Sequence, residues 1–242
     1  MKNFLRTIVC FLCCALMFTG KISADSTSTN TQSIRQNESI SGAVENSSMT
    51  RVESRSRNAA VKIETPHGYG SGTYTRIGDH NVVITAAHVV DSSPIVFVVG
   101  RGGERLPAAV VFMDSENDFA VVATGDLETR ETVRFKPYRR DPGTLIGEDI
   151  SYTGFPNHHD LMTIRGSVAG IERGYIILQS YSWMGASGSG IFDDRGNFVG
   201  VLSAVDLGRF RGSYQIVSSV VWIIPITSID LGTLESHLDS VL

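Results

Sequence analysis

The sequence predicts an all-β protein made of two halves of similar length. From residue 59 onward, short apolar or alternating runs rich in Val, Ile, Tyr and Phe are separated by Gly, Asp, Asn and Pro, as expected of strands joined by turns. No long run with the 3.6-residue period of a helix separates these runs. About six runs fall on each side of residues 128–134, which predicts two β-barrels or sandwiches packed together.

The N-terminal residues have the layout of a secretory signal peptide. Lys2 and Arg6 precede an apolar run from Thr7 to Phe18, and small residues follow up to Ala24. The run is about a dozen residues long, whereas a membrane-spanning helix needs roughly 20. We therefore expect a signal peptide over residues 1–24 and a secreted, periplasmic or cell-surface product. An uncleaved anchor is the alternative, and it is the one route by which we expect contact with a membrane.

The composition of the chain limits the classes of molecule that it is expected to bind. The 242 residues are 42% apolar and carry a net charge of −4. Removing residues 1–24 leaves 18 basic and 25 acidic residues, a net charge of −7. A chain this acidic is not expected to bind nucleic acid. All three cysteines lie inside the predicted signal peptide, so the exported product forms no internal disulfide, as is typical of bacterial or viral exported proteins.

Residues 25–58 are predicted to be a flexible linker or pro-segment. Half of these residues are Ser, Thr or Asn, and the few apolar residues show no period. Such a segment buries too little apolar surface to offset the entropy lost on ordering.

The first predicted barrel covers about residues 59–127 and the second about residues 132–226. The candidate strands of the first are residues 60–65, 69–77, 81–85, 95–99, 106–113 and 119–123, and those of the second are residues 133–138, 149–153, 162–171, 175–179, 190–192, 198–203 and 215–224.

The last residues, about 227–242, are predicted to form a helix. The apolar side chains of this segment recur at near-helical spacing, at Ile229, Leu231, Leu234, Leu238 and Val241. We expect this helix to cover the second barrel.

A Gly- and Ser-rich segment in the second half has the properties of a nucleophile loop. Gly185-Ala186-Ser187-Gly188-Ser189-Gly190 places a hydroxyl among residues that let the backbone turn sharply and approach a ligand closely. The N–H groups of Gly185 and Ser187 can converge on one point, as an oxyanion hole requires. Taken alone, the segment is equally typical of a hairpin turn.

The first half supplies candidate partners for that hydroxyl. His88 follows a buried strand and small residues, and Asp118 begins another apolar strand thirty positions later. An imidazole that accepts a proton and a carboxylate that orients it complete the requirements of serine-based acyl transfer. Each residue alone has a plainer interpretation, as a core histidine and as a turn aspartate. Asp91 and Asp114 are rival carboxylates, but neither precedes an apolar strand.

Together the three segments carry a family resemblance. Thr85-Ala86-Ala87-His88, Asp118-Phe119-Ala120 and Gly185-Ala186-Ser187-Gly188 resemble the signature blocks of the trypsin-like (chymotrypsin-fold) serine peptidases, in that family's order of His, Asp and Ser. The resemblance spans nearly all of residues 59–226. Three further segments, residues 69–73, 154–156 and 165–171, look most like the bacterial and viral branch, including the high-temperature-requirement proteases.

This resemblance implies two six-stranded antiparallel β-barrels with the active site between them. It further implies that Ser187 is the nucleophile, His88 the general base and Asp118 the orienting carboxylate. The amides of Gly185 and Ser187 would form the oxyanion hole. The expected activity is that of a serine endopeptidase acting on protein or peptide substrates, without cofactor or metal.

The resemblance also implies a substrate-binding strand and a specificity pocket. Residues 199–205 resemble the edge strand that pairs with an extended substrate, which places Ser203, Ala204 and Val205 at the substrate. Val205 falls at the pocket entrance, where many relatives have glycine, and Tyr181 falls at the base, where trypsin-type enzymes have an acid. A narrowed pocket without a buried carboxylate is expected to refuse Lys and Arg and to accept small or medium apolar side chains.

The chain departs from the family pattern at Ser189, where most members have glycine. Ser189 is also a second candidate nucleophile, but it lacks the preceding Gly-x pair. A catalytically silent peptide-binding or adhesion module of the same fold is the main alternative function. An α/β-hydrolase is disfavoured, because that fold needs G-x-S-x-G and orders its triad Ser, acid, His.

Overall fold

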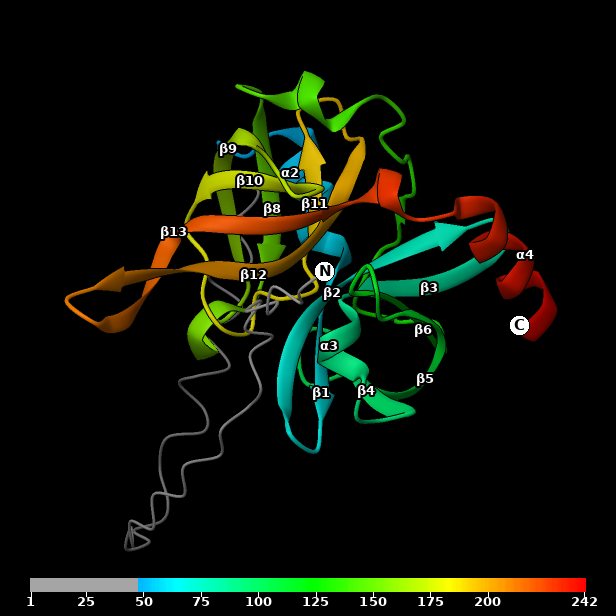
Figure 1. The fold of residues 1–242 in the computed structure, drawn as a ribbon. Helices are drawn as coiled ribbons and strands as arrows, with labels where there is room; N and C mark the ends of the chain where they lie inside the picture. Colours follow the sequence, from blue (N-terminus) through cyan, green and yellow to red (C-terminus); the bar gives the residue numbers. More distant parts are fainter. Residues whose placement is uncertain (1–47) are drawn as a thin grey trace, which may run out of the picture. The chain divides into compact units, whose positions relative to one another are not determined.

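The computed structural model describes residues 48–242, so the predicted signal peptide and most of the predicted linker lie outside the described residues. The predicted fold class is confirmed: the chain forms two closed six-stranded antiparallel β-barrels followed by a C-terminal helix (Figure 1). None of the helices within residues 48–242 has the length and apolar character needed to cross a bilayer.

The first barrel closes because its first strand pairs on both edges. β1 hydrogen-bonds to β2 on one side and to β4 on the other, which gives the closed order β1-β2-β3-β6-β5-β4. Alternate residues of each strand fill the interior, among them Val61, Val83 and Val122, which are fully buried. Its strands are β1 (Ala60–Thr65), β2 (Gly68–Ile77), β3 (His80–Thr85), β4 (Ile95–Val99), β5 (Arg105–Asp114) and β6 (Phe119–Thr124), and the short helix α3 (Ala87–Val90) follows β3.

The second barrel closes in the order β10-β13-β12-β11-β8-β9. Tyr152, Leu178 and Ile191 are among the fully buried side chains of its core. Its strands are β8 (Asp149–Gly154), β9 (Met162–Glu172), β10 (Tyr175–Ser180), β11 (Gly190–Asp193), β12 (Phe198–Phe210) and β13 (Ser213–Pro225), and the 3₁₀ turns η1 (Pro142–Leu145), η2 (Pro156–His158) and η3 (Ile226–Ser228) complete this half.

The segment between the barrels contains little strand. Of the predicted strand at residues 133–138, only β7 (Val133–Arg134) forms, and it pairs in parallel with β2 of the first barrel. Beyond β7, pairing is reduced to an isolated parallel bridge between Pro137 and Phe198 of β12.

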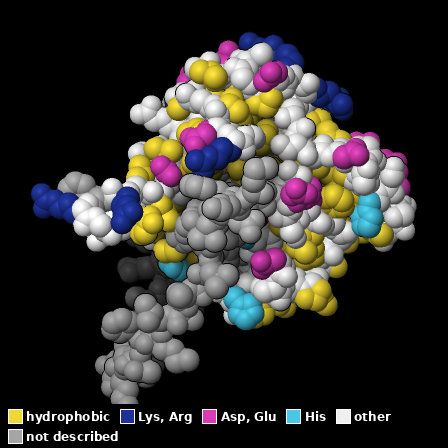
Figure 2. Space-filling model, in the orientation of Figure 1, with side chains coloured by type: hydrophobic (Ala, Val, Ile, Leu, Met, Phe, Trp, Pro, Cys, Tyr) yellow, Lys and Arg dark blue, Asp and Glu magenta, His cyan; other side chains and the backbone are white. Residues whose placement is uncertain are grey.

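β12 is longer than predicted, because it continues past residue 203 and pairs with β13 to form a projecting hairpin (Figure 1). Arg211 and Gly212 form the two-residue turn, both with positive φ (50° and 85°), as in the tight turns that match the twist of paired strands. Basic side chains lie at the tip of this hairpin in Figure 2.

The C-terminal helix α4 (Leu231–Val241) begins at Asp230, whose carboxylate accepts from the N–H groups of Gly232 and Thr233. The expectation that it covers the second barrel is wrong. His237 Nε2 donates to the Val111 carbonyl on β5 at 2.8 Å, and Asp239 lies 3.0 Å from His80 of β3. The apolar spacing predicts that the helix buries one face, but it does not say against which barrel.

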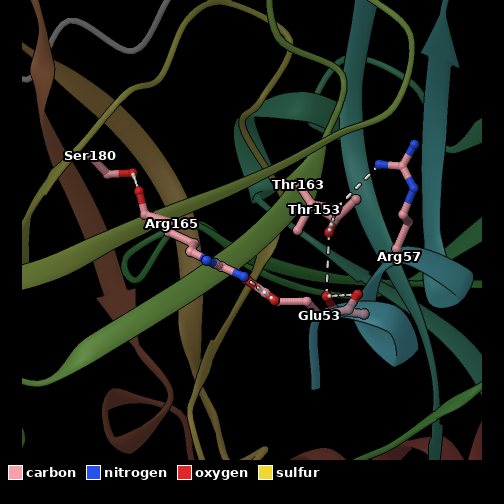
Figure 3. A network of polar contacts seen from close by, with 7 residues as sticks. Glu53, Arg57, Thr153, Thr163, Arg165 and Ser180 are labelled. Atoms are coloured by element: carbon pink, nitrogen blue, oxygen red, sulfur yellow. Dashed lines mark hydrogen bonds and ion pairs between the residues drawn. The ribbon is translucent and has the colours of Figure 1, made fainter. Parts of the chain in front are cut away.

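The structure also corrects the end of the predicted flexible linker. Residues Arg51–Ala59 form helix α2, which runs directly into β1. Glu53 of α2 is only 3% exposed and pairs with Arg165 of β9, and the two side chains point toward each other in Figure 3. Ser56 lies 3.3 Å from the Thr153 hydroxyl. Contacts with residues about 100 positions away in the sequence order this helix. The composition of the segment does not indicate these contacts.

Candidate active site

His88 is fixed by Asp118 at three points. The chain leaves the buried strand β3 at Thr85 and turns into α3, which carries His88 with its side chain 11% exposed. His88 Nδ1 lies 2.9 Å from both oxygens of Asp118, and the His88 backbone N–H donates to Asp118 Oδ1, also at 2.9 Å. Because the carboxylate accepts at Nδ1, that nitrogen carries the proton and Nε2 presents a lone pair.

Asp118 reaches this position through an unusual backbone conformation. Its φ is 49°, in the left-handed region that non-glycine residues rarely adopt. Ser203 Oγ donates to Asp118 Oδ2 at 2.5 Å. Burial by itself disfavours the charged carboxylate, but the ring and charge of His88, the Ser203 hydroxyl and the His88 amide together hold the pKa of Asp118 below its ordinary value. The carboxylate is therefore ionised at neutral pH.

The nucleophile loop begins with a tight turn. Ala186 N–H donates to the Trp183 carbonyl at 3.0 Å, and Gly185, at the third position of this turn, has a φ of 93°. A positive φ at that position defines a type II turn, which only glycine adopts readily. Within residues 48–242, the N–H groups of Gly185 and Ser187 donate to no acceptor.

Ser187 is half-buried, and its hydroxyl donates to the Ser203 carbonyl at 3.3 Å. Among the described residues, no hydrogen bond joins that hydroxyl to His88. The contact between the predicted base and the predicted orienting carboxylate is thus present, whereas the hydroxyl of the predicted nucleophile is directed at a neighbouring acceptor.

Strand β2 of the first barrel holds the loop in place. Ser71 Oγ donates to the Gly185 carbonyl at 2.7 Å and accepts from Phe155 N–H at 3.0 Å. The Ser71 N–H donates to the Ser187 carbonyl at 2.8 Å, while the Ser71 carbonyl accepts from Thr85 Oγ1. Ser71 therefore ties the loop of the second barrel to the first.

The rival residues occupy structural positions. Ser189 is fully buried beneath Gly154, where a β-carbon on that glycine would lie 2.2 Å from Ser189 Oγ. Asp114 accepts from the N–H groups of Glu116 and Asn117 and so closes the turn before β6. Asp91 is exposed at the end of α3.

Comparison with known proteins assigns the family. The family model of the trypsin-like peptidase domain matches residues 70–201, which is more than half of the chain. The chain belongs to the trypsin-like peptidase family. The resemblance inferred from the three signature blocks is thereby confirmed.

Two individual proteins are similar to this family member. The serine endoprotease from Yersinia pestis superimposes with a TM-score of 0.60 at 18% sequence identity, over 78% of this chain and 65% of that one. An uncharacterized protein, y4bJ, from Sinorhizobium fredii (strain NBRC 101917 / NGR234) is 26% identical over 163 residues. This match covers 63% of the present chain and 24% of the Sinorhizobium protein. The Yersinia structure supports the fold alone at this level of identity.

The residues predicted to bind substrate lie beside this site. Ser203, Ala204 and Val205 are on β12, and β12 pairs with β13 along one edge. No strand of the described residues pairs with the other edge at these three positions, because β11 pairs with β12 only as far as Val201. Val205 is 8% exposed and Tyr181 is 40% exposed.

Two residues contribute to the candidate site in ways that the sequence did not predict. The hydroxyl of Ser203 contacts Asp118, although the sequence predicted Ser203 only as a substrate-binding residue. Ser71 belongs to the segment of residues 69–73 that carries part of the family resemblance, but its role depends on partners more than 80 residues away. No local sequence signal identifies such a partner.

Proposed function

We propose that this protein is a serine endopeptidase that cleaves peptide bonds through an acyl-enzyme intermediate, with Ser187, His88 and Asp118 as its catalytic triad. The observation that carries the proposal is the contact of His88 Nδ1 with both oxygens of Asp118, which leaves Nε2 as a base beside the nucleophile loop. The unpaired N–H groups of Gly185 and Ser187 supply the oxyanion hole.

Acylation begins with a rotation of the Ser187 side chain about its Cα–Cβ bond, away from the Ser203 carbonyl and toward His88. Catalytic hydrogen bonds are often made only in the substrate complex. The Ser187 oxygen then bonds to the scissile carbonyl carbon while its proton passes to His88 Nε2, and the carbonyl oxygen becomes an anion held by the two N–H groups.

The C–N bond breaks as the protonated His88 gives its proton to the leaving amine. Water then attacks the carbonyl carbon of the acyl-enzyme while His88 takes one of its protons. The bond between that carbon and the Ser187 oxygen breaks as His88 gives the proton to the oxygen, which releases the carboxylic acid product and restores the free serine. The ionised Asp118 stabilises the positive charge on His88 during both halves of the reaction.

Substrate would pair along the free edge of β12 at Ser203, Ala204 and Val205, so that its main chain is held in extended form. Val205 is largely buried, and in this proposal its side chain would narrow the entrance to the specificity pocket. We propose cleavage after small or medium apolar residues, since a charged side chain would lose its hydration there without gaining an ionic partner. We also propose that the protein is exported, in keeping with the signal-like N-terminal sequence, and its substrates would then lie outside the cytoplasm.

One observation favours a second candidate, a catalytically silent peptide-binding module. The Ser187 hydroxyl donates to Ser203 rather than to His88. If substrate does not redirect the hydroxyl, the fold would still bind an extended peptide along β12 without cleaving it.

A fluorophosphonate probe separates the two candidates, because it reacts with a serine only when that serine is activated. We expect labelling of wild-type protein on the peptide that contains Ser187, and loss of labelling in Ser187→Ala and in His88→Ala. Ser189→Ala is the matched control and should label normally if it folds. Normal folding without labelling of the wild type would contradict the proposed activity and favour the silent module.

A peptide library incubated with the same preparations tests specificity. Cleavage should follow Ala, Val or similar residues and be absent in Ser187→Ala. Efficient cleavage after Lys or Arg would contradict the pocket assignment while leaving the peptidase assignment intact.

A further inference from the structure

We infer that Tyr69 is a positioning residue for the oxyanion hole, acting through the η2 turn. The inference rests on the proposed peptidase function and adds a residue that is neither in the proposed triad nor among the residues predicted to bind substrate. The connecting contact is between Asn157 of η2 and the nucleophile loop: Asn157 N–H donates to the Met184 carbonyl at 2.7 Å.

This contact fixes the direction of the Gly185 N–H. Met184 and Gly185 share one planar trans peptide, in which the carbonyl and the N–H point in opposite directions. With the Met184 carbonyl held by Asn157, the Gly185 N–H must point away from η2, and it remains unpaired among the described residues. Rotating this peptide to the type I arrangement would break the Asn157 contact and reverse the N–H, which would remove one of the two oxyanion donors.

The η2 turn that presents the Asn157 N–H is itself strained. Asn157 (φ 51°, ψ 43°) and His158 (φ 58°) are consecutive non-glycine residues in the left-handed region. Side chains disfavour this conformation, and it persists only where the surroundings hold it.

Tyr69 provides that support. The Tyr69 hydroxyl oxygen accepts from the His158 N–H at 2.6 Å, and the two rings lie with their centroids 4.9 Å apart. The Tyr69 ring also lies against the oxyanion peptide, because a β-carbon at Gly185 would be 2.5 Å from Tyr69 Cε2. The Lys62 ammonium, 4.7 Å from the ring centroid, contributes a cation–π contact to the same ring. Tyr69 thus contacts both the strained turn and the peptide that the turn orients.

Tyr69→Phe tests the inference, because it keeps the ring and removes only the acceptor for His158. We expect kcat on a peptide substrate to fall about 5- to 100-fold, with KM nearly unchanged. This decrease is at most comparable to the decrease in kcat that follows removal of an entire oxyanion-hole donor. A reversible peptide aldehyde, whose hemiacetal oxygen occupies the oxyanion hole, should bind more weakly by a similar factor. A rise in KM with unchanged kcat would instead indicate a general loosening of the substrate groove and would overturn the inference.

Tyr138→Phe is the matched control, since the Tyr138 hydroxyl also makes a hydrogen bond, 2.5 Å from Thr144 Oγ1, that has no link to the oxyanion peptide. It should retain wild-type kcat and aldehyde affinity. If Tyr69→Phe behaves like this control, the inference fails while the peptidase function stands. If wild type and control are both folded but inactive, the proposed function itself fails.

A second variant tests the strain argument. Glycine adopts the left-handed region without cost from a side chain, so adding Asn157→Gly to Tyr69→Phe should recover at least part of the lost kcat. A folded double variant with no recovery would contradict the role assigned to strain in η2.

Discussion

At the scale of single residues, the site depends on how a buried charge is stabilised. Asp118 has an 18% exposed side chain, and desolvation alone would raise its pKa. Hydrogen bonds from His88 and Ser203 outweigh this effect and lower the pKa. The same contacts that keep the carboxylate ionised also orient the imidazole, so the electrostatics and the geometry of the site have a common origin.

Removal of the Ser203 hydroxyl is expected to raise the pKa of Asp118 relative to the wild type. A lowered pKa in the folded state stabilises the protein above the unfolded-state pKa, and this contribution is lost as the pH falls through the folded-state pKa. Ser203→Ala should therefore lower the free energy of unfolding by about 1–2 kcal/mol near pH 7, and the difference from wild type should narrow below about pH 4.

Urea unfolding between pH 3 and pH 7 measures this difference. Ser180→Ala is the control, because the Ser180 hydroxyl donates to the uncharged Arg165 carbonyl at 3.1 Å. Its effect should not vary with pH. A Ser203→Ala difference that stays constant over the same range would show that Asp118 does not depend on this hydroxyl for its charge.

At the scale of elements, helix α2 shows how polar residues can order a segment. Arg57 of α2 donates to the Thr163 hydroxyl at 3.2 Å (Figure 3) and to the Leu161 carbonyl at 3.0 Å. These contacts add to those of Glu53 and Ser56. A carboxylate as buried as Glu53 is tolerated only when it is paired. The pairing with Arg165 accordingly raises the pKa of Arg165.

Arg165→Gln is expected to destabilise the protein, because it removes the Arg165 guanidinium from its contact with the buried Glu53 carboxylate. Arg173→Gln is the matched control, since Arg173 pairs with Glu172 at 3.4 Å and both side chains are exposed. Thermal unfolding should show a clear decrease in Tm for Arg165→Gln and almost none for Arg173→Gln. Equal Tm values for the two variants would mean that the ion pair does not hold α2.

The elements differ in how far the sequence predicts them. The boundaries of β1 and β4 agree with the predicted ranges 60–65 and 95–99. Alternation of apolar and polar residues in β1 and an unbroken apolar run in β4 are both local signals. Residues 206–210 of β12 were not predicted, since the stretch around Gly208 lacks a clear alternation and its pairing depends on the Arg211-Gly212 turn. The three blocks that indicate the triad were recognisable as short motifs, whereas Ser71, Tyr69 and α2 act through contacts between residues distant in sequence.

At the scale of the whole molecule, the proposed active site takes residues from both barrels, so the two barrels must be held in a fixed arrangement. His88 and Asp118 come from the first barrel and Ser187 from the second. Ser71, Thr73 and Thr75 alternate along β2, so their side chains lie on one face of the strand. They bond respectively to the nucleophile loop, to β11 and to the segment between the barrels. A row of hydroxyls on the first barrel thus fixes the position of the second.

Thr73→Val tests this coupling with almost no change in side-chain volume. Thr73 is 2% exposed and accepts from the Gly190 N–H at 3.0 Å. Valine cannot accept, so this N–H of the second barrel would stay buried without a partner, which should lower the free energy of unfolding by about 1–3 kcal/mol. Thr124→Val, whose hydroxyl bonds within the first barrel to the exposed Pro107 carbonyl, should have a smaller effect.

Comparison of two spectroscopic signals during urea unfolding shows whether the two barrels unfold as one cooperative unit. Both tryptophans of the chain, Trp183 and Trp222, belong to the second barrel, whereas far-UV circular dichroism reports on strands of both. If the shared hydroxyl row couples the barrels, Thr73→Val shifts the tryptophan and circular dichroism transitions to the same lower urea concentration. The alternative result is two separated transitions, with the tryptophan transition of Thr73→Val at the same urea concentration as in wild type. That result would show that each barrel is stable alone. The active site would then depend on docking of the barrels rather than on their joint folding.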